Sequence, residues 1–293
     1  MFTMADKGNV TVALNKSEYL RKMDTLFSDV TTYKKIKKSP LKYRQHKINK
    51  LLKRWNVNEY LNRKYKDHEL TQTDTSLPRA YGLAKIHKQN CPFRPVISAE
   101  GSPTYFLAQF LYIISSECPG KPKFHVKNSF EFIKKIKNKS ISKNHRVISL
   151  DVKSLYTNVG KQRFIQALEK RAHLINSRCK IPLNEIIEAT ELLMDNTSFQ
   201  FNNKFYTQIF GTPMGSSISG LFADLVMEDL ETECLRKLSF APAFYFRYVD
   251  DVITCVPHDK IDEILAMFNT YDDRLQFTYE IENTQNLHFS VDF

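Results

Sequence analysis

Two adjacent aspartates between two β-rich runs constrain this chain more than any other feature. Residues 245–249 and 252–256 are rich in aromatic and β-branched side chains, so they predict a hairpin with Asp250 and Asp251 at its tip. Neighbouring carboxylates repel each other and, when buried, prefer to be neutral unless a cation lies beside them. The tip therefore predicts a divalent metal site, although an Asp-rich turn without a ligand also explains an isolated pair of this kind.

A third aspartate stands upstream in a similar setting. Residues 146–152 predict a strand, and Asp151 lies near its end. Together with Asp250 and Asp251 it forms a ligand set suited to two Mg²⁺ ions, which prefer carboxylate oxygens and substrate phosphates, and Mn²⁺ can substitute. Two such ions can activate an attacking 3′-hydroxyl and stabilise the leaving oxygen of an in-line displacement.

The charge of the chain is unevenly distributed. The net charge is +11, but residues 31–70 hold 13 Lys and Arg against 3 Asp and Glu, whereas residues 215–293 hold 5 against 15. A basic surface is typical of phosphate binding, and an acidic half suits metal ions better than a nucleic-acid backbone. Solvated lysine-rich helices explain the same charge without any ligand.

A basic helix is predicted within the positive segment. Ser39 and Pro40 form a helix start signal, and apolar residues follow at helical spacing up to Trp55. We expect the basic side chains to fill the outer face and to contact a nucleic-acid backbone, with Lys47, Lys50 and Arg54 as the main candidates; the full set is Lys42, Arg44, Lys47, Lys50, Lys53 and Arg54. The interleaved aromatic residues Tyr43 and Trp55 modestly favour nucleic acid.

Two further stretches indicate contact with a nucleotide. Residues 77–88 and 92–98 predict a second hairpin, in which Lys85, Lys88 and Arg94 converge and can grip a triphosphate. Residues 211–220 are rich in glycine and serine and lead into a long helix, so they permit close approach of the backbone to a ligand. This second motif is weak by itself, because glycine-rich helix starts are common.

The composition excludes several classes of protein. Hydrophobic residues make up 42% of the chain and there are only 8 glycines, which predicts a folded core. The five cysteines lie far apart and suggest neither a zinc site nor a disulfide framework, so a reducing intracellular compartment fits best. The most apolar stretch, residues 105–114, is too short to span a bilayer, and the first residues do not form a signal peptide.

The order of these motifs resembles that of reverse transcriptases. The resemblance rests on residues 150–159 (LDVKSLYTNV), then 211–215 (GTPMG), then 248–251 (YVDD). Residues 5–9 (ADKGN), 81–88 (YGLAKIHK) and 94–98 (RPVIS) narrow it to Penelope-like retroelements, which are related to telomerase. The resemblance covers nearly the whole chain, and its motifs together are highly specific.

The resemblance implies an α+β fold, the fingers and palm of a right-hand polymerase, with an antiparallel palm sheet backed by helices and no thumb. Residues 1–67 would form a basic helical extension, residues 68–145 the fingers, with residues 68–77 as a linker, and residues 146–293 the palm, ending near the hairpin that holds the primer. The GIY-YIG endonuclease domain of many relatives is not expected here. Gly160 departs from the family, which usually has proline at that position.

The resemblance also implies a role for each site residue. Asp151 and Asp250 would be the main metal ligands, with the Val152 carbonyl as an additional one. Asp251 is the second aspartate of the hairpin, and because neighbouring strand residues face opposite ways, its role as a ligand is the least certain. Tyr156 would exclude a 2′-hydroxyl, unless it is a core tyrosine. Lys85 and Arg94 would contact the triphosphate, and Met214 and Gly215 would lie beside the templating base pair.

The expected function is RNA-directed DNA synthesis, in which a primer 3′-hydroxyl attacks the α-phosphate of a deoxynucleoside triphosphate. The partners would be an RNA template, a DNA primer and dNTPs, with no membrane, and the resemblance implies a nuclear protein. The alternative is a truncated or decayed domain that binds nucleic acid without polymerising. A telomerase-like enzyme with its own RNA is not supported, because no separate RNA-binding domain is expected before the fingers.

Overall fold

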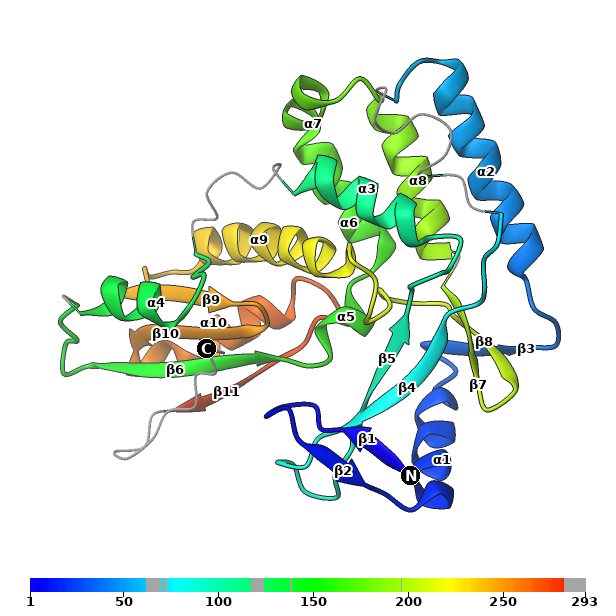
Figure 1. Ribbon diagram of the computed structural model, residues 1–293. Coiled ribbons are helices and arrows are strands. Elements are labelled where there is room, and N and C mark those ends of the chain that lie inside the picture. The colour runs from blue at the N-terminus through cyan, green and yellow to red at the C-terminus, as the bar shows by residue number, and fades with distance from the viewer. Residues whose placement is uncertain (62–69, 71–72, 117–123, 138, 196, 282–293) are drawn as a thin grey trace. The chain divides into compact units, whose positions relative to one another are not determined.

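The computed structural model describes residues 1–61, 70, 73–116, 124–137, 139–195 and 197–281, so the predicted linker at 68–77 lies partly outside the described residues. The chain forms two compact units (Figure 1). The first unit contains residues 1–118 and 160–222, and the second contains residues 119–159 and 223–293. The boundaries drawn from the sequence for a basic extension, fingers and palm remain a prediction.

The second unit is built on a four-stranded antiparallel sheet. Its strand order is β11 (Phe277–Ile281), β6 (His145–Val152), β10 (Asp251–Pro257) and β9 (Phe244–Tyr248). One face packs against α4 (Ser129–Ile136), where the ring of Phe132 meets the ring of Phe246 with centroids 5.9 Å apart. Strands β9 and β10 confirm the predicted hairpin, and β6 confirms the predicted strand that carries Asp151.

The opposite face of this sheet is covered by α9 (Ser219–Lys237), whose first residues belong to the first unit, and by α10 (Ile261–Asn269). Tyr245 on β9 contacts Phe268 of α10, with ring centroids 6.1 Å apart, and its hydroxyl donates to Glu231 of α9 at 3.0 Å. Both faces of the sheet are therefore buried, which explains the nearly continuous apolar runs in β6 and β10. A short helix, α5 (Leu155–Asn158), follows β6.

The first unit contains two sheets. Strands β1 (Phe2–Met4) and β2 (Thr11–Ala13) form a hairpin, while the larger sheet has the order β3 (Tyr33–Ile36), β8 (Lys204–Gln208), β7 (Ser198–Phe201), β4 (Arg79–Ala84) and β5 (Phe93–Ser98). Helix α1 (Lys16–Phe27) packs on the larger sheet, and Phe27 contacts four aromatic rings there. Those rings belong to Tyr33, Phe199, Phe201 and Tyr206, with centroids 4.9–5.3 Å away.

Five helices form a separate layer of the first unit: α2 (Leu41–Val57), α3 (Tyr105–Ser115), α6 (Lys161–Lys170), α7 (Ala172–Arg178) and α8 (Leu183–Asp195). Helix α8 is central, because it contacts α2, α3, α6 and α7. Trp55 of α2 is fully buried and lies 6.0 Å from the ring of Phe110 on α3. Packing of this apolar layer, rather than helix propensity, holds the lysine-rich α2 in place.

Helix α1 begins with a side-chain cap. Asn15 is the N-cap residue, and its side chain accepts from the backbone N–H of Ser17 at 3.0 Å. The cap therefore satisfies an orphan donor of the first turn, as expected of Asn at this position. Within the described part of the chain, no helix is long and apolar enough to cross a membrane, and the four cysteines found there are free thiols.

Candidate active site

The aspartate hairpin is closed by a two-residue turn. Asp251 pairs with Tyr248 across the hairpin, so Val249 and Asp250 are the two central residues of the turn. Val249 has a φ of 55°, and Asp250 is not among the residues with positive φ. A positive φ at the first central residue alone is typical of a type II′ hairpin turn, where glycine is usual. A β-branched residue there stores about 1–3 kcal/mol of backbone strain, so the surrounding structure must hold the turn that carries Asp250.

Asp151 and Asp251 are direct partners in the antiparallel ladder between β6 and β10. Side chains of directly opposed residues lie on the same face, about 4.5–5.5 Å apart at Cβ, and like charges at that separation destabilise the pair. Asp151 is exposed and both hairpin aspartates are half-buried. Asp250 lies in the turn and not in a strand, so strand alternation does not force Asp250 and Asp251 to face opposite ways. Asp251 can therefore serve as a ligand beside Asp250.

The fit of a metal ion to this site rests on the carboxylates themselves. Among the described residues, no group of three or more His, Cys, Asp and Glu side chains is arranged to hold an ion. Two carboxylates are nonetheless opposed at one sheet end, and Mg²⁺ in phosphoryl-transfer sites is commonly held by one or two carboxylates plus substrate phosphates. The residues therefore fit a divalent cation that binds together with its substrate.

Tyr156 lies just after the strand that carries Asp151. Ser154 has a φ of 50°, which turns the chain sharply out of β6 into α5. The side chain of Asn158 donates to the Lys153 carbonyl at 2.8 Å and fixes this turn. Tyr156 is half-buried, and Val152 is buried at 3% exposure. Both belong to the same unit as the three aspartates, while their roles as gate and carbonyl ligand remain predictions.

Lys85 and Arg94 lie on the β4–β5 hairpin of the first unit. Arg94 pairs with Leu83, and the N–H of Lys85 donates to the Pro92 carbonyl at 2.9 Å, so alternation places Lys85 and Arg94 on one side of the hairpin. Arg94 also has a partner that the sequence did not reveal, since its Nε lies 3.2 Å from Oδ1 of Asp6. The Asp6 side chain is 1% exposed and neither of its oxygens accepts a hydrogen bond from the described residues, so the contact is an ion pair only.

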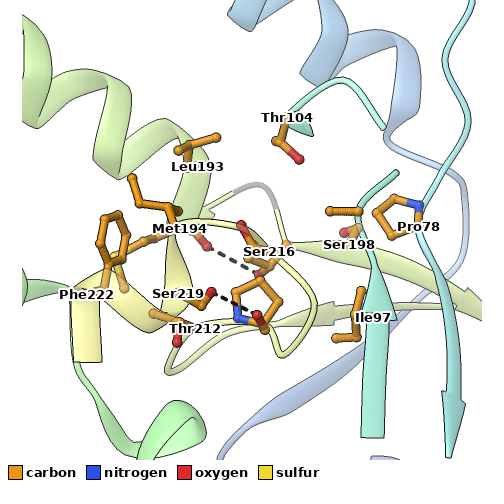
Figure 2. Close-up of a pocket in the computed structure, with 14 residues that line it drawn as sticks. Pro78, Ile97, Thr104, Leu193, Met194, Ser198, Thr212, Ser216, Ser219 and Phe222 are labelled. Carbon is orange, nitrogen blue, oxygen red and sulfur yellow. Dashed lines mark hydrogen bonds between the residues drawn. The ribbon is translucent and has the colours of Figure 1, made fainter. Parts of the chain in front are cut away.

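The loop at residues 211–218 packs against β5. The N–H of Ile97 donates to the Met214 carbonyl at 2.6 Å. Gly215 has a φ of 114°, and a Cβ at this position would overlap the Ile97 carbonyl. The close approach that glycine permits is therefore an approach to the protein's own backbone. Beneath the loop lies a cavity of about 30 Å³, room for a single water, where Ser219 Oγ donates to the Pro213 carbonyl at 2.8 Å (Figure 2).

The basic face of α2 is smaller than the sequence predicted. Lys47 and Lys50 are exposed as expected, and Lys47 Nζ lies 4.7 Å from the centroid of the Tyr43 ring. One assignment was wrong. Arg44 is 9% exposed and its Nη2 donates to Thr207 Oγ1 at 3.3 Å, so it does not belong to the outer face. Trp55 is fully buried, as its place in the apolar spacing predicted, so its ring adds nothing to a nucleic-acid surface. Arg44, Ile48, Leu51 and Trp55 share one helical face.

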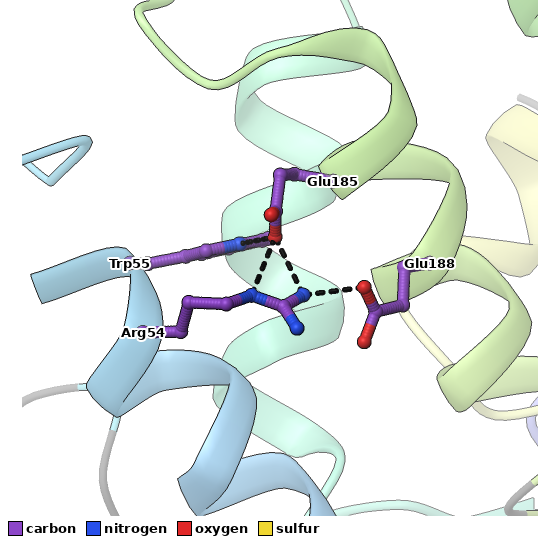
Figure 3. Close-up of polar contacts among 4 residues, drawn as sticks. All are labelled: Arg54, Trp55, Glu185 and Glu188. Carbon is purple, nitrogen blue, oxygen red and sulfur yellow. Dashed lines mark hydrogen bonds and ion pairs between the residues drawn. The ribbon is translucent and has the colours of Figure 1, made fainter. Parts of the chain in front are cut away.

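Arg54 is tied to two glutamates of α8 (Figure 3). Its Nε and Nη2 donate to Glu185 Oε2 at 3.1 and 2.7 Å, and Nη2 also donates to Glu188. The same oxygen of Glu185 accepts from the Trp55 indole at 2.7 Å. Glu188 and Glu185 raise the pKa of Arg54 above its usual value. The guanidinium therefore joins two helices, and its predicted contact with nucleic acid would have to compete with these carboxylates.

Sequence reasoning missed a buried ion pair beside the aspartate turn. Arg247 on β9 is 2% exposed, and its Nε donates to Glu231 Oε1 of α9 at 2.7 Å. Glu231 is 1% exposed. A charged residue is almost never buried without a partner, so an arginine inside an apolar strand was the available signal. The sequence could not identify the partner, because Glu231 lies 16 positions earlier on another element.

Comparisons with known proteins agree with this fold. The antiparallel sheet that presents opposed carboxylates next to a tight hairpin, with helices behind it, is the polymerase-like α+β arrangement. The profile of the family described as reverse transcriptase (RNA-dependent DNA polymerase) matches residues 104–287, which is more than half of the chain. The chain therefore belongs to the reverse transcriptase family, and so to the polymerase-type nucleotidyltransferases. No curated protein is matched by this chain.

Solved structures match the fold over nearly all of the chain. Telomerase from Candida albicans, in complex with a fragment of telomeric RNA, has a TM-score of 0.65 at 12% identity, covering 100% of this chain and 52% of that one. Candida tropicalis telomerase, truncated from its C-terminal domain, has a TM-score of 0.60 at 10% identity, covering 97% and 59%. An RNA polymerase complex inside a double-stranded RNA virus has a TM-score of 0.52 at 12% identity, covering 82% and 25%. The chain thus spans about half the length of the telomerases, and the likeness confirms the fingers-and-palm type of fold.

Proposed function

We propose that the protein is an RNA-directed DNA polymerase of a Penelope-like retroelement, which extends a primer 3′-hydroxyl with dNTPs. The observation that carries the proposal is the register of Asp151 opposite Asp251, beside the turn that carries Asp250, within the region matched by the reverse transcriptase family. The Penelope-like origin rests on the motifs at residues 5–9, 81–88 and 94–98.

The three aspartates have the central part in the proposed reaction. Asp151 and Asp250, assisted by Asp251 and the Val152 carbonyl, would hold two Mg²⁺ ions. Bound there, the ions would lower the pKa of the primer hydroxyl and neutralise charge on the leaving pyrophosphate. The protein contributes a rigid frame for the ligands, since β6 and β10 are paired along seven residues each and buried on both faces.

Other residues would bind and select the nucleotide. Lys85 and Arg94 would grip the triphosphate, and Arg94 suits this role because it stays 38% exposed while a buried carboxylate anchors it. Tyr156 would oppose a 2′-hydroxyl by its bulk. Met214 would lie beside the templating pair, with Gly215 fixing the backbone of that loop.

The nucleic-acid partners would be held by the basic segment. Lys47 and Lys50 are exposed on α2, and within the described ranges neither forms an ion pair with an acidic side chain, unlike Arg54. An open groove of about 520 Å³ beside β3 adds Lys34, Lys35 and Lys204 to the positive surface of the same unit, although Lys204 is paired with Asp24 at 3.0 Å. Such lysines bind phosphates without reading sequence, which suits an RNA template and a DNA primer.

Primer extension tests the proposal. We expect the protein to extend a DNA primer on an RNA template in Mg²⁺, and Asp151→Asn and Asp250→Asn each to lower the rate by about 10²-fold or more, because charge stabilisation of the transition state is lost. Their affinity for template-primer, measured by fluorescence anisotropy, should stay unchanged.

Asp259→Asn is the matched control, because Asp259 is exposed just past the far end of β10 and its replacement changes the net charge equally. Extension at the wild-type rate by either active-site variant refutes the metal-ligand assignment. Tight binding of template-primer by a wild-type protein that never extends it would favour the second candidate, a nucleic-acid-binding domain without polymerase activity.

A further inference from the structure

Arg247 is among the largest fully buried side chains of the described residues, and it lies three positions before Asp250. Its backbone is fixed from one side, since its N–H donates to the Phe124 carbonyl and its carbonyl accepts from the Val126 N–H, both at 2.9 Å. These bonds cover the outer edge of β9. The Arg247 side chain is therefore attached to a backbone that cannot shift easily.

The Arg247 guanidinium makes three hydrogen bonds, two to side chains of α9 and one to the backbone of the turn. Its Nε donates to Glu231 Oε1 at 2.7 Å, and its Nη1 donates to Asp224 Oδ1 at 2.8 Å and to the Val249 carbonyl at 2.9 Å. The first two bonds join the strand to α9. The third reaches the carbonyl of the strained turn residue, which belongs to the peptide bond leading into Asp250.

The group that orients the guanidinium is itself held in place. Glu231 is 1% exposed, and its Oε1 also accepts from the Tyr245 hydroxyl at 3.0 Å. Burial by itself lowers the pKa of Arg247, but the charges of Glu231 and Asp224 raise it above the ordinary value, so the guanidinium stays charged. With Nε donating to Glu231 and Nη1 donating to Asp224, the planar fork of arginine has a single orientation.

Strain makes the third bond important. The positive φ of Val249 costs conformational free energy, and a turn of that kind persists only where surrounding contacts hold it in place. The hydrogen bond from Nη1 fixes the orientation of the Val249–Asp250 peptide plane, and the Asp250 side chain leaves the backbone directly after that plane. Without the bond, the turn can relax to a conformation with negative φ at Val249, which redirects Asp250.

We propose that Arg247 is a positioning residue for catalysis: through its bond to the Val249 carbonyl, and oriented by Glu231, it holds the aspartate turn in the strained conformation that aims Asp250 at the metal ion. This inference rests on the proposed function, because it assumes that Asp250 is a metal ligand. Arg247 touches neither substrate nor metal. Its effect is on the readiness of the site to bind the ion.

The test compares Arg247→Lys with Tyr245→Phe. Lysine keeps the buried charge, but an ammonium lacks the planar fork that serves Glu231 and Val249 together. Tyr245→Phe removes one hydrogen bond from the same network without touching the turn, so it is the matched structural control. Mn²⁺ binding is measured by electron paramagnetic resonance on protein with template-primer and a non-hydrolysable dNTP, and Mg²⁺ half-saturation is measured in primer extension.

We expect Arg247→Lys to weaken Mn²⁺ binding and raise the half-saturating Mg²⁺ concentration by about 10-fold or more, the range found when a group that orients a metal ligand is lost. Template-primer affinity should stay unchanged, and Tyr245→Phe should lower the melting temperature with metal binding intact. If Arg247→Lys does not fold by circular dichroism, Glu231→Gln, which keeps the side-chain shape, takes its place with the same expectation.

Two results overturn the inference. One is a folded Arg247→Lys or Glu231→Gln protein with wild-type metal binding, and the other is an equal loss of metal binding in Tyr245→Phe. The Asp250→Asn protein separates this failure from that of the proposed function. If wild type binds Mn²⁺ and Asp250→Asn does not, the proposed ligand stands whatever Arg247 does; if the two bind alike, the ligand assignment fails and the inference fails with it.

Discussion

Two kinds of positive charge on α2 should respond in opposite ways to substitution. Lys47 and Lys50 are exposed and available to phosphates, whereas Arg54 is bound to Glu185 and Glu188. The double substitution Lys47→Gln with Lys50→Gln should therefore weaken nucleic-acid binding and leave the fold intact. Arg54→Gln should destabilise the fold and leave nucleic-acid binding intact.

The expected magnitudes follow from the contacts. Each phosphate contact adds about 0.9 to the log–log salt slope on duplex DNA, so losing two should flatten the slope by about 1.8. Between 50 and 200 mM salt, that change makes wild type lose about 12-fold more affinity than the double variant. Arg54 is 39% exposed at its side chain and Glu185 is 12% exposed, so screening reduces the value of this charged contact to about 1–2 kcal/mol. The melting temperature of Arg54→Gln should fall by roughly 2–8 °C.

Fluorescence anisotropy of a labelled template-primer at several salt concentrations measures the slope, and differential scanning fluorimetry measures the melting temperature. Lys237→Gln with Lys260→Gln is the matched control, because it removes the same charge from lysines that pair with Glu233 and Glu263 outside the basic segment. A flattened slope in Arg54→Gln together with an unchanged slope in the Lys47 and Lys50 variant would refute the reasoning.

Three further results are expected. Tyr156→Ala should raise the use of ribonucleotides relative to deoxynucleotides by about 10-fold or more in single-turnover extension, and an equal fall for both would make it a packing residue. Gly215→Ala should cost about 1–3 kcal/mol in thermal melting, because a Cβ meets the Ile97 carbonyl at a positive φ, whereas Gly220→Ala, with open space around its Cβ, should not destabilise. Burial raises the pKa of the Cys234 thiol to about 12, with Glu233 adding to the rise. Its contribution to stability should be complete below pH 9 and lost as pH rises towards 12, and alkylation of native protein at pH 9 should be much slower than of unfolded protein.

Local patterns predicted the hairpin and the strand that carries Asp151, because β-branched and aromatic runs bounded by turn residues are short-range signals. The register that places Asp151 opposite Asp251 is not encoded in any short-range signal. The two residues are 100 positions apart, and only the packing of both strands into one sheet sets their alignment. Val249 was expected to continue a strand, since its side chain favours one, and the closing of a two-residue turn overrides that preference.

The error on α2 has a physical cause too. Counting basic residues assigned Arg44 to the outer face, although its spacing from Ile48 and Trp55 places it on the buried one. Residue spacing could not identify Glu231 as the partner of Arg247, because no sequence periodicity links a strand to a helix that packs across its face. The assignments of Met214 and Tyr156 to bound nucleotide came from motif order, those of Lys85 and Arg94 also from their place on one predicted hairpin, and all four remain predictions.

The pairing of β6 has a consequence for how the chain folds during synthesis. Both neighbours of this strand in the sheet, β10 and β11, are made more than 90 residues after it. At about 5–20 residues per second, Val147, Ile148 and Leu150 would leave the ribosome roughly 5–20 s before any strand can cover them. In contrast, β4 and β5 pair almost as soon as they are made. The strand that bears the first aspartate is therefore exposed to aggregation in the nascent protein, and slower growth at low temperature or added chaperones should raise the soluble yield.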